Sequence, residues 1–196
     1  DSLRRAAEKL ATDQEMTPEE AFVIEAIIIP DLRPAIDIQD GRYSVAHKSW
    51  LHFNGDPIRR NILAAIPAVG RIGLPGHPSM PYCGTGFVVG PDLVMTNRHV
   101  AEFFCTGLGY EGLSFTPGHQ PRIELRCERE RADSIDLRLV APVVIHPEWD
   151  MALLRVEGLP SDLVPLTLST AEIESMDKED VAVIGYPAFD HRSPAD

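Results

Sequence analysis

The sequence predicts a mainly β protein with an N-terminal α-helical extension. From about residue 68, short runs rich in β-branched and aromatic residues alternate with Gly, Pro and Asp turns, at the spacing of a small β-barrel or sandwich. Before residue 60, apolar residues recur at helical spacing instead. The 196 residues are 44% hydrophobic and 24% charged, which excludes wholesale disorder and fibrous repeats.

Two helices are predicted to open the chain. In the first, four apolar residues share one face: Leu3, Ala6, Ala7 and Leu10. The second begins at a capping box, T-P-E-E over residues 17–20, with proline at the first helical position, and it ends before Pro30. A short strand is predicted at residues 35–38, before the Asp-Gly pair at 40–41. Nothing in residues 1–60 indicates a catalytic or binding site.

The second part of the chain is predicted to consist of strands joined by turns. We expect them at residues 68–73, 86–89, 93–96, 122–127, 137–144, 151–156 and 181–185. Residues 98–104 (R-H-V-A-E-F-F) are expected to form one or two helical turns between strands.

Charge and hydropathy exclude two classes of partner. The chain has 18 basic and 30 acidic residues, a net charge of −12, and no basic cluster longer than Arg59-Arg60. Phosphate backbones would repel such a chain, so no nucleic-acid partner is expected. No apolar run approaches the roughly 18–20 residues that span a bilayer, so no membrane partner is expected either.

The cysteines indicate a reducing environment. Cys83, Cys105 and Cys127 are odd in number and form no C-x-x-C pair, which disfavours both a zinc site and a disulfide framework. We therefore expect reduced thiols in a cytoplasmic protein.

Two short stretches have the composition of a catalytic site. The first, residues 84–100 (G-T-G-F-V-V-G-P-D-L-V-M-T-N-R-H-V), predicts a strand, a turn and a second strand, followed by His99 at a strand-to-helix corner. The second, residues 146–156 (H-P-E-W-D-M-A-L-L-R-V), places Asp150 at the mouth of a buried strand, where desolvation strengthens the effect of its charge.

These stretches resemble the motifs of the chymotrypsin-like (trypsin-fold) serine peptidases, in a form that looks like the bacterial-type members. The family's histidine motif, T-[AN]-x-H-[CV], is matched by T-N-R-H-V at residues 96–100. Its aspartate motif, D-[IM]-A-L-L-[KR]-[LV], is matched by D-M-A-L-L-R-V at residues 150–156, and the order His before Asp is that of the family.

The resemblance covers about residues 65–190 and implies a chymotrypsin-like antiparallel β-barrel. It divides the chain into a helical extension (1–60), the first barrel (61–175) and the start of a second, truncated barrel (176–196). Residues 181–187 (V-A-V-I-G-Y-P) resemble the strand that begins the family's second barrel.

The resemblance also implies roles for the two residues. His99 is expected to be the general base, and Asp150 is expected to hold its other ring nitrogen in a triad that hydrolyses the peptide bonds of protein or peptide substrates. No cofactor and no metal is expected, since His99 serves as both base and acid. Cys83 stands where secreted members place one half of a disulfide, but Val100 stands where the other half would be, so that bridge cannot form.

The family's nucleophile is not found in this sequence. It lies in a G-[DN]-S-G-[GS] loop, whereas Ser169, Ser175 and Ser193 lack the flanking glycines that build an oxyanion hole. We therefore expect a half enzyme: a fragment, a processed chain or one piece of a two-chain assembly, inactive alone. Its expected partner is the C-terminal peptidase barrel, in cis or as a second chain.

Two alternatives remain open. In one, the chain is a non-catalytic peptide-binding or regulatory module that keeps the barrel without the chemistry. In the other, His146, Glu148 and Asp150 share one face of a strand and imitate a metal site. We favour the peptidase over the metal site, because Pro147 interrupts that strand and Asp150 fits the peptidase motif.

Overall fold

The computed structural model describes residues 35–76, 82–128, 131–171 and 180–186. From Ile38 onward these residues belong to one compact unit. The two helices predicted before residue 30 lie outside the described residues. Among the residues that are described, no helix has the length and apolar character needed to cross a membrane.

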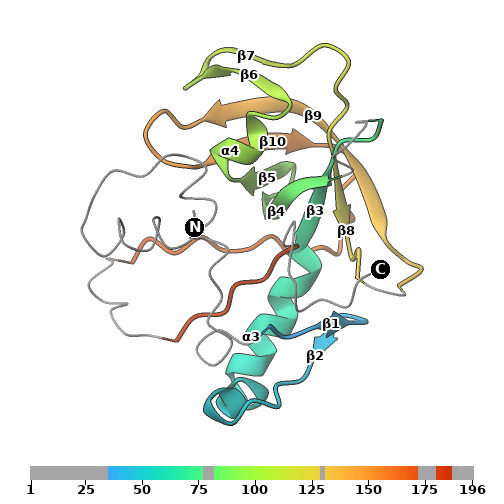
Figure 1. Cartoon of the computed structure of the whole chain (residues 1–196), viewed down its shortest axis with the longest axis vertical. Coiled ribbons are helices and arrows are strands. Elements are labelled where there is room, and N and C mark those ends of the chain that lie inside the picture. The colour runs from blue at the N-terminus through green and yellow to red at the C-terminus, as the bar shows by residue number, and fades with distance from the viewer. Residues whose placement is uncertain (1–34, 77–81, 129–130, 172–179, 187–196) are drawn as a thin grey trace, which may run out of the picture. The chain divides into compact units, whose positions relative to one another are not determined.

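A closed barrel of six antiparallel strands forms the centre of this unit (Figure 1). In chain order the strands are β3 (Val69–Gly73), β4 (Tyr82–Gly90), β5 (Leu93–Thr96), β8 (Arg122–Leu125), β9 (Ile135–Ile145) and β10 (Ala152–Val156). Around the barrel the order is β10-β5-β4-β3-β8-β9, and pairing of β9 with β10 closes it. The prediction of a mainly β fold built on an antiparallel barrel is confirmed.

The predicted barrel strands are present, and the ends of three of them differ notably from the prediction. β4 begins at Tyr82, four residues before the predicted start, because its pairing with β3 continues to Tyr82, opposite Gly73. β8 ends at Leu125, earlier than predicted, because Arg126 adopts a left-handed φ of 55° that a strand does not accommodate. β9 runs longer than predicted, from Ile135 to Ile145. It passes Pro142 at a register shift against β10, where a bulge accommodates a residue without an N–H.

The strand predicted at residues 181–185 is wrong. Within the described segment 180–186 no residue is paired as a strand. Within this segment the backbone N–H of Tyr186 instead donates to Thr85 Oγ1 of β4, at 2.8 Å. Apolar, β-branched composition indicates a strand, but a strand also needs a hydrogen-bonded neighbour.

The hairpin that follows β5 was not predicted. β6 (Cys105–Leu108) and β7 (Glu111–Phe115) pair antiparallel, and Gly109 bridges to Ile145 of β9. Three glycines with positive φ, at positions 107, 109 and 112, interrupt the alternation that would have indicated these strands.

The segment before the barrel contains a hairpin and short helices. β1 (Ile38–Gln39) and β2 (Arg42–Tyr43) are joined by Asp40 and Gly41 at φ 49° and 68°, as in a type I′ turn. The strand predicted at 35–38 is therefore displaced, because this turn sets the register. 3-10 helices follow at Lys48–Asn54 and Ile66–Ala68, on either side of α3 (Ile58–Ala65), which was not predicted. The predicted boundary after residue 60 falls inside α3; the domain boundaries remain predictions.

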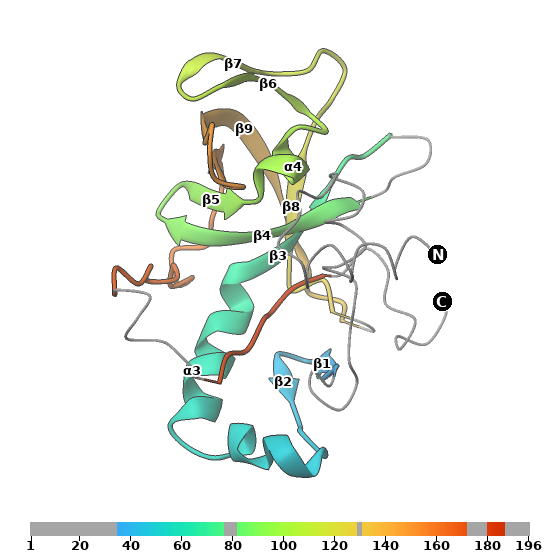
Figure 2. The same ribbon diagram turned by 60° about the vertical axis from the view of Figure 1, so that its left-hand side comes forward.

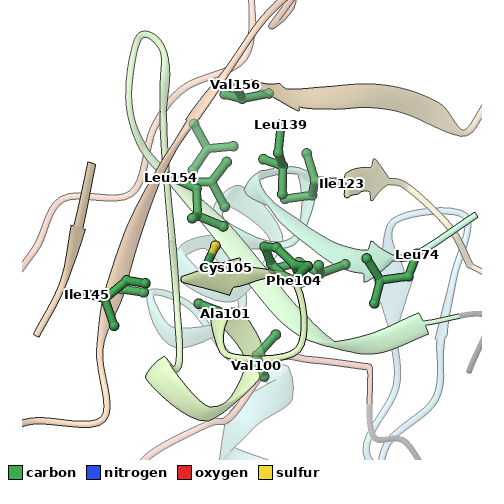
Figure 3. Packing of buried hydrophobic residues seen from close by; sticks show 14 of the residues in the cluster. Leu74, Val100, Ala101, Phe104, Cys105, Ile123, Leu139, Ile145, Leu154 and Val156 are labelled. Carbon is green, nitrogen blue, oxygen red and sulfur yellow. The ribbon is translucent and has the colours of Figure 1, made fainter. Parts of the chain in front are cut away.

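The hydrophobic core of the barrel includes residues of α4 (Arg98–Ala101). This single helical turn lies between strands β4 and β5 and the β6–β7 hairpin (Figures 1 and 2). Val100, Ala101 and Phe104 are buried in the same cluster as Ile123, Leu139 and Leu154 of the strands (Figure 3). Gly84 of β4 makes this packing possible, because a Cβ at that position would lie 2.5 Å from Val100 Cγ2. The core therefore fixes the helical turn that carries His99.

Candidate active site

His99 is held at a rigid corner between β5 and α4. The preceding strand ends at Thr96, a buried residue whose Oγ1 donates to the carbonyl oxygen of Thr85 at 2.8 Å. Asn97 is extended, with φ −71° and ψ 148°, and α4 begins at Arg98. His99 is thus the second residue of a short helix anchored through Val100, as the sequence predicted for this corner.

Strand register brings Asp150 to the same place. β10 pairs with β5 so that Ala152 lies opposite Thr96. Because the strands are antiparallel, residues that precede Ala152 lie beside residues that follow Thr96. Asp150 thereby reaches His99 although 51 positions separate them in the sequence.

His99 and Asp150 make two direct contacts. The ring Nδ1 of His99 lies 2.7 Å from Asp150 Oδ2, and the backbone N–H of His99 donates to Asp150 Oδ1 at 2.9 Å. Partial burial acts to raise the pKa of Asp150, but the hydrogen bonds from His99 outweigh it and hold that pKa below its ordinary value. Asp150 is therefore ionised at neutral pH and favours a proton on Nδ1 of the ring.

The second ring nitrogen of His99 is available for proton transfer. In the described part of the chain, Nε2 has no hydrogen-bond partner. The His99 and Asp150 side chains retain 47% and 41% of their exposure. Solvent therefore reaches the His99 side chain while Asp150 holds Nδ1.

The loop before Asp150 is built around His146. Its Nδ1 accepts the backbone N–H groups of Glu148 and Trp149, at 3.2 and 2.9 Å, and the Trp149 ring stacks on it at 4.7 Å. Residues 146–150 form this turn and are not paired as a strand, so the strand face weighed as a metal site does not exist. Across the described residues no cluster of His, Cys, Asp and Glu could hold a metal ion.

Two residues at the site were not singled out from the sequence. Arg98 Nη1 donates to the carbonyl oxygens of His146 and Pro147, at 3.2 and 2.7 Å, and so ties α4 to the loop. Asn97 Nδ2 donates to Asp150 Oδ2 at 3.1 Å. Their position beside His99 in the T-N-R-H motif could have pointed to them. Their hydrogen-bond partners could not be predicted, because those partners lie in a loop about fifty residues away.

The remaining candidates lie elsewhere. Ser169 Oγ accepts a local bond from the N–H of Ala171, at 3.2 Å, while Ser175 and Ser193 lie outside the described residues. The three cysteines are free, and burial raises the pKa of Cys83 and Cys105 to about 12, which makes both thiols poor nucleophiles near neutral pH.

The sequence was compared with known families and proteins. The profile of the trypsin-like peptidase domain matches residues 84–195, a stretch that includes both His99 and Asp150. The chain belongs to the trypsin-like peptidase domain family. The resemblance to chymotrypsin-like peptidases is confirmed at that level, and the barrel of this trypsin-like domain agrees with it. No curated protein matches the sequence.

Proposed function

We propose that this trypsin-like domain supplies the histidine and aspartate of a serine endopeptidase triad. The observation that carries the proposal is the 2.7 Å contact between His99 Nδ1 and Asp150 Oδ2, in a chain whose family is peptidases. His99 is the general base and acid, and Asp150 orients its ring and stabilises the imidazolium.

The proposed mechanism uses the two faces of the His99 ring. Nε2 takes the proton of a serine hydroxyl while that oxygen attacks the carbonyl carbon of the scissile peptide bond. The imidazolium then gives the proton to the leaving amine, and the acyl-enzyme is hydrolysed by water that His99 activates in the same way. The negative charge of Asp150 attracts the ring most strongly when the ring is positive, so it stabilises the imidazolium that forms in these steps.

The serine is proposed to come from a C-terminal peptidase barrel, in cis or as a second chain. None of the serines in the sequence has glycine beside it, so none stands in a loop that resembles the family's nucleophile. The segment that resembles the start of the second barrel is strongly exposed, with Val181 at 75% and Val183 at 94%. Apolar side chains of this kind are normally covered, which supports a partner at this segment.

The proposed substrates are proteins or peptides, hydrolysed without a cofactor. We also propose a cytoplasmic location, on the basis of three free cysteines. Titration of thiols in denaturant tests this point: three are expected, and fewer would indicate a disulfide and an oxidising compartment.

The decisive experiment combines the chain with the sequence that follows it, or with its partner chain. The completed protein is expected to cleave fluorogenic peptides and to react with a serine-directed phosphonate. His99→Ala and Asp150→Asn should abolish or sharply reduce turnover, whereas Asp162→Asn, at an exposed position, should not. Peptide binding without cleavage would identify a non-catalytic peptide-binding module. Cleavage that survives His99→Ala would refute the triad.

A further inference from the structure

The asparagine before α4 does not perform the task its position suggests. Asn97 occupies the N-cap of α4, where an asparagine oxygen commonly accepts an N–H of the first helical turn. Here its side chain makes no such bond. The N–H of His99, two residues into the turn, donates to Asp150 Oδ1 instead. The Asp150 carboxylate thus replaces the capping oxygen, and the Asn97 amide is available for another partner.

That partner is Asp150 itself. Asn97 Nδ2 lies 3.1 Å from Asp150 Oδ2 and 3.3 Å from the Asp150 carbonyl oxygen. An ionised carboxylate accepts hydrogen bonds and cannot donate them, which fixes the nitrogen side of the amide toward it. Asp150 therefore accepts from three groups on two residues: the Asn97 amide, the His99 backbone N–H and the His99 ring.

We propose that Asn97 is a positioning residue: its amide holds the Asp150 carboxylate in the rotamer that presents Oδ2 to Nδ1 of His99. The catalytic consequence rests on the proposed peptidase function. An exposed ion pair contributes little by itself, because water competes and both side chains are free to rotate. A second fixed donor on Oδ2 restricts that rotation.

The neutral amide suits this task. It stabilises the ionised carboxylate without adding a positive charge that would oppose the imidazolium form of His99. Arg98, the next residue, acts on the loop backbone and on Glu102, whose Oε1 lies 3.6 Å from its Nε. The two residues that precede His99 therefore have different tasks: Arg98 holds the loop and Asn97 holds the carboxylate.

The test is an NMR titration of the Asp150 carboxyl group in the 196-residue chain. Asn97→Ala removes the donor and should raise the pKa of Asp150 by about 0.5 or more, a roughly threefold fall in its acid dissociation constant. Asn97→Asp keeps the shape but places a like charge beside Oδ2, so it should raise that pKa further. If the alanine variant fails to fold, Asn97→Asp still tests the role of Asn97, because it replaces the donor by a carboxylate of the same shape and should shift the pKa in the same direction.

Asn61→Asp, exposed on α3, adds the same charge away from the site and should leave the Asp150 titration unchanged. An Asp150 pKa that moves by less than about 0.1 in Asn97→Ala would overturn the proposal, and so would an equal shift in Asn61→Asp. The titration needs neither substrate nor second barrel. If the pKa of Asp150 shifts but the completed protein does not cleave peptides, the proposed function is refuted and the positioning role of Asn97 stands. If the pKa does not move but peptide cleavage depends on His99, only the role of Asn97 is refuted. In the completed peptidase, Asn97→Ala should lower kcat and leave KM unchanged.

Discussion

Gly84→Ala should reveal how strongly the barrel core fixes the helical turn that carries His99. A Cβ at Gly84 would lie 2.5 Å from Cγ2 and 3.1 Å from Cγ1 of Val100. Val100 is buried and β-branched, so it cannot rotate away without moving α4. Overpacking of this kind costs about 1–3 kcal/mol in the free energy of unfolding.

The matched control is Gly90→Ala in the same strand, where the nearest side-chain atoms to a new Cβ are those of Leu93, at an ordinary 3.4 Å. Both substitutions restrict the unfolded chain alike, a stabilising effect of about 0.4–1 kcal/mol, so their difference isolates the clash with Val100. Urea unfolding followed by the fluorescence of the two tryptophans measures both variants.

A double-mutant cycle identifies the cause. Val100→Ala alone removes two buried methyl groups and should cost about 2 kcal/mol, including the cavity left behind. In Gly84→Ala/Val100→Ala the clash is absent and the new methyl fills part of that cavity. The double variant should therefore be more stable than the sum of the single effects predicts, by about 2 kcal/mol. Additive effects, or a Gly84→Ala variant as stable as Gly90→Ala, would refute the packing account.

Three further predictions concern activity, pH and thiols. The 196 residues alone should neither hydrolyse peptides nor react with a serine-directed phosphonate, because the sequence contains no glycine-flanked serine; labelling that survives His99→Ala would point to a different nucleophile. Asp150 has its pKa lowered in the fold from 3.8, so its contribution to stability is present above about pH 4 and is lost as pH falls through the lowered value. Urea unfolding between pH 2 and 6 should show this loss, and Asp150→Asn should reduce the pH dependence; an identical dependence in the variant would contradict it. Cys83 and Cys105, with pKa values of about 12, should react slowly with iodoacetamide at pH 8 in the native protein and rapidly in urea; equal native and denatured rates would show that neither thiol is protected.

Local patterns were sufficient for much of the barrel. The strand at 93–96 was predicted with the bounds that the structure has, because a β-branched, apolar run is closed by turn residues on one side and by the T-N-R-H corner on the other. Predictions failed where glycines interrupted alternation, as in β6 and β7, or where a suitable run lacked a neighbour, as at residues 181–185. In each case the missing information lies in pairing rather than in composition.

At the candidate site, too, the sequence indicated some features, and others became visible only in the structure. The two motifs indicated His99 and Asp150 as partners, since each residue stands in a short segment that resembles a motif of the family. Neither motif indicated that Asp150 caps α4, or that Asn97 donates to Asp150 instead of to its own helix. Those contacts join residues more than fifty positions apart.

By itself, the sequence determined the mainly β class and the approximate positions of the barrel strands, because these depend on alternation and turn residues. Two short motifs that resemble those of the trypsin-like peptidases indicated the two residues proposed for catalysis. Only the tertiary structure decided how the barrel closes, which residue lies opposite Thr96, and hence which donors surround the Asp150 carboxylate. The physical reason is that strand register and helix packing are non-local. They are set by hydrogen bonds between distant strands and by the contact of Val100 with Gly84, and neither leaves a trace in the local periodicity of the chain.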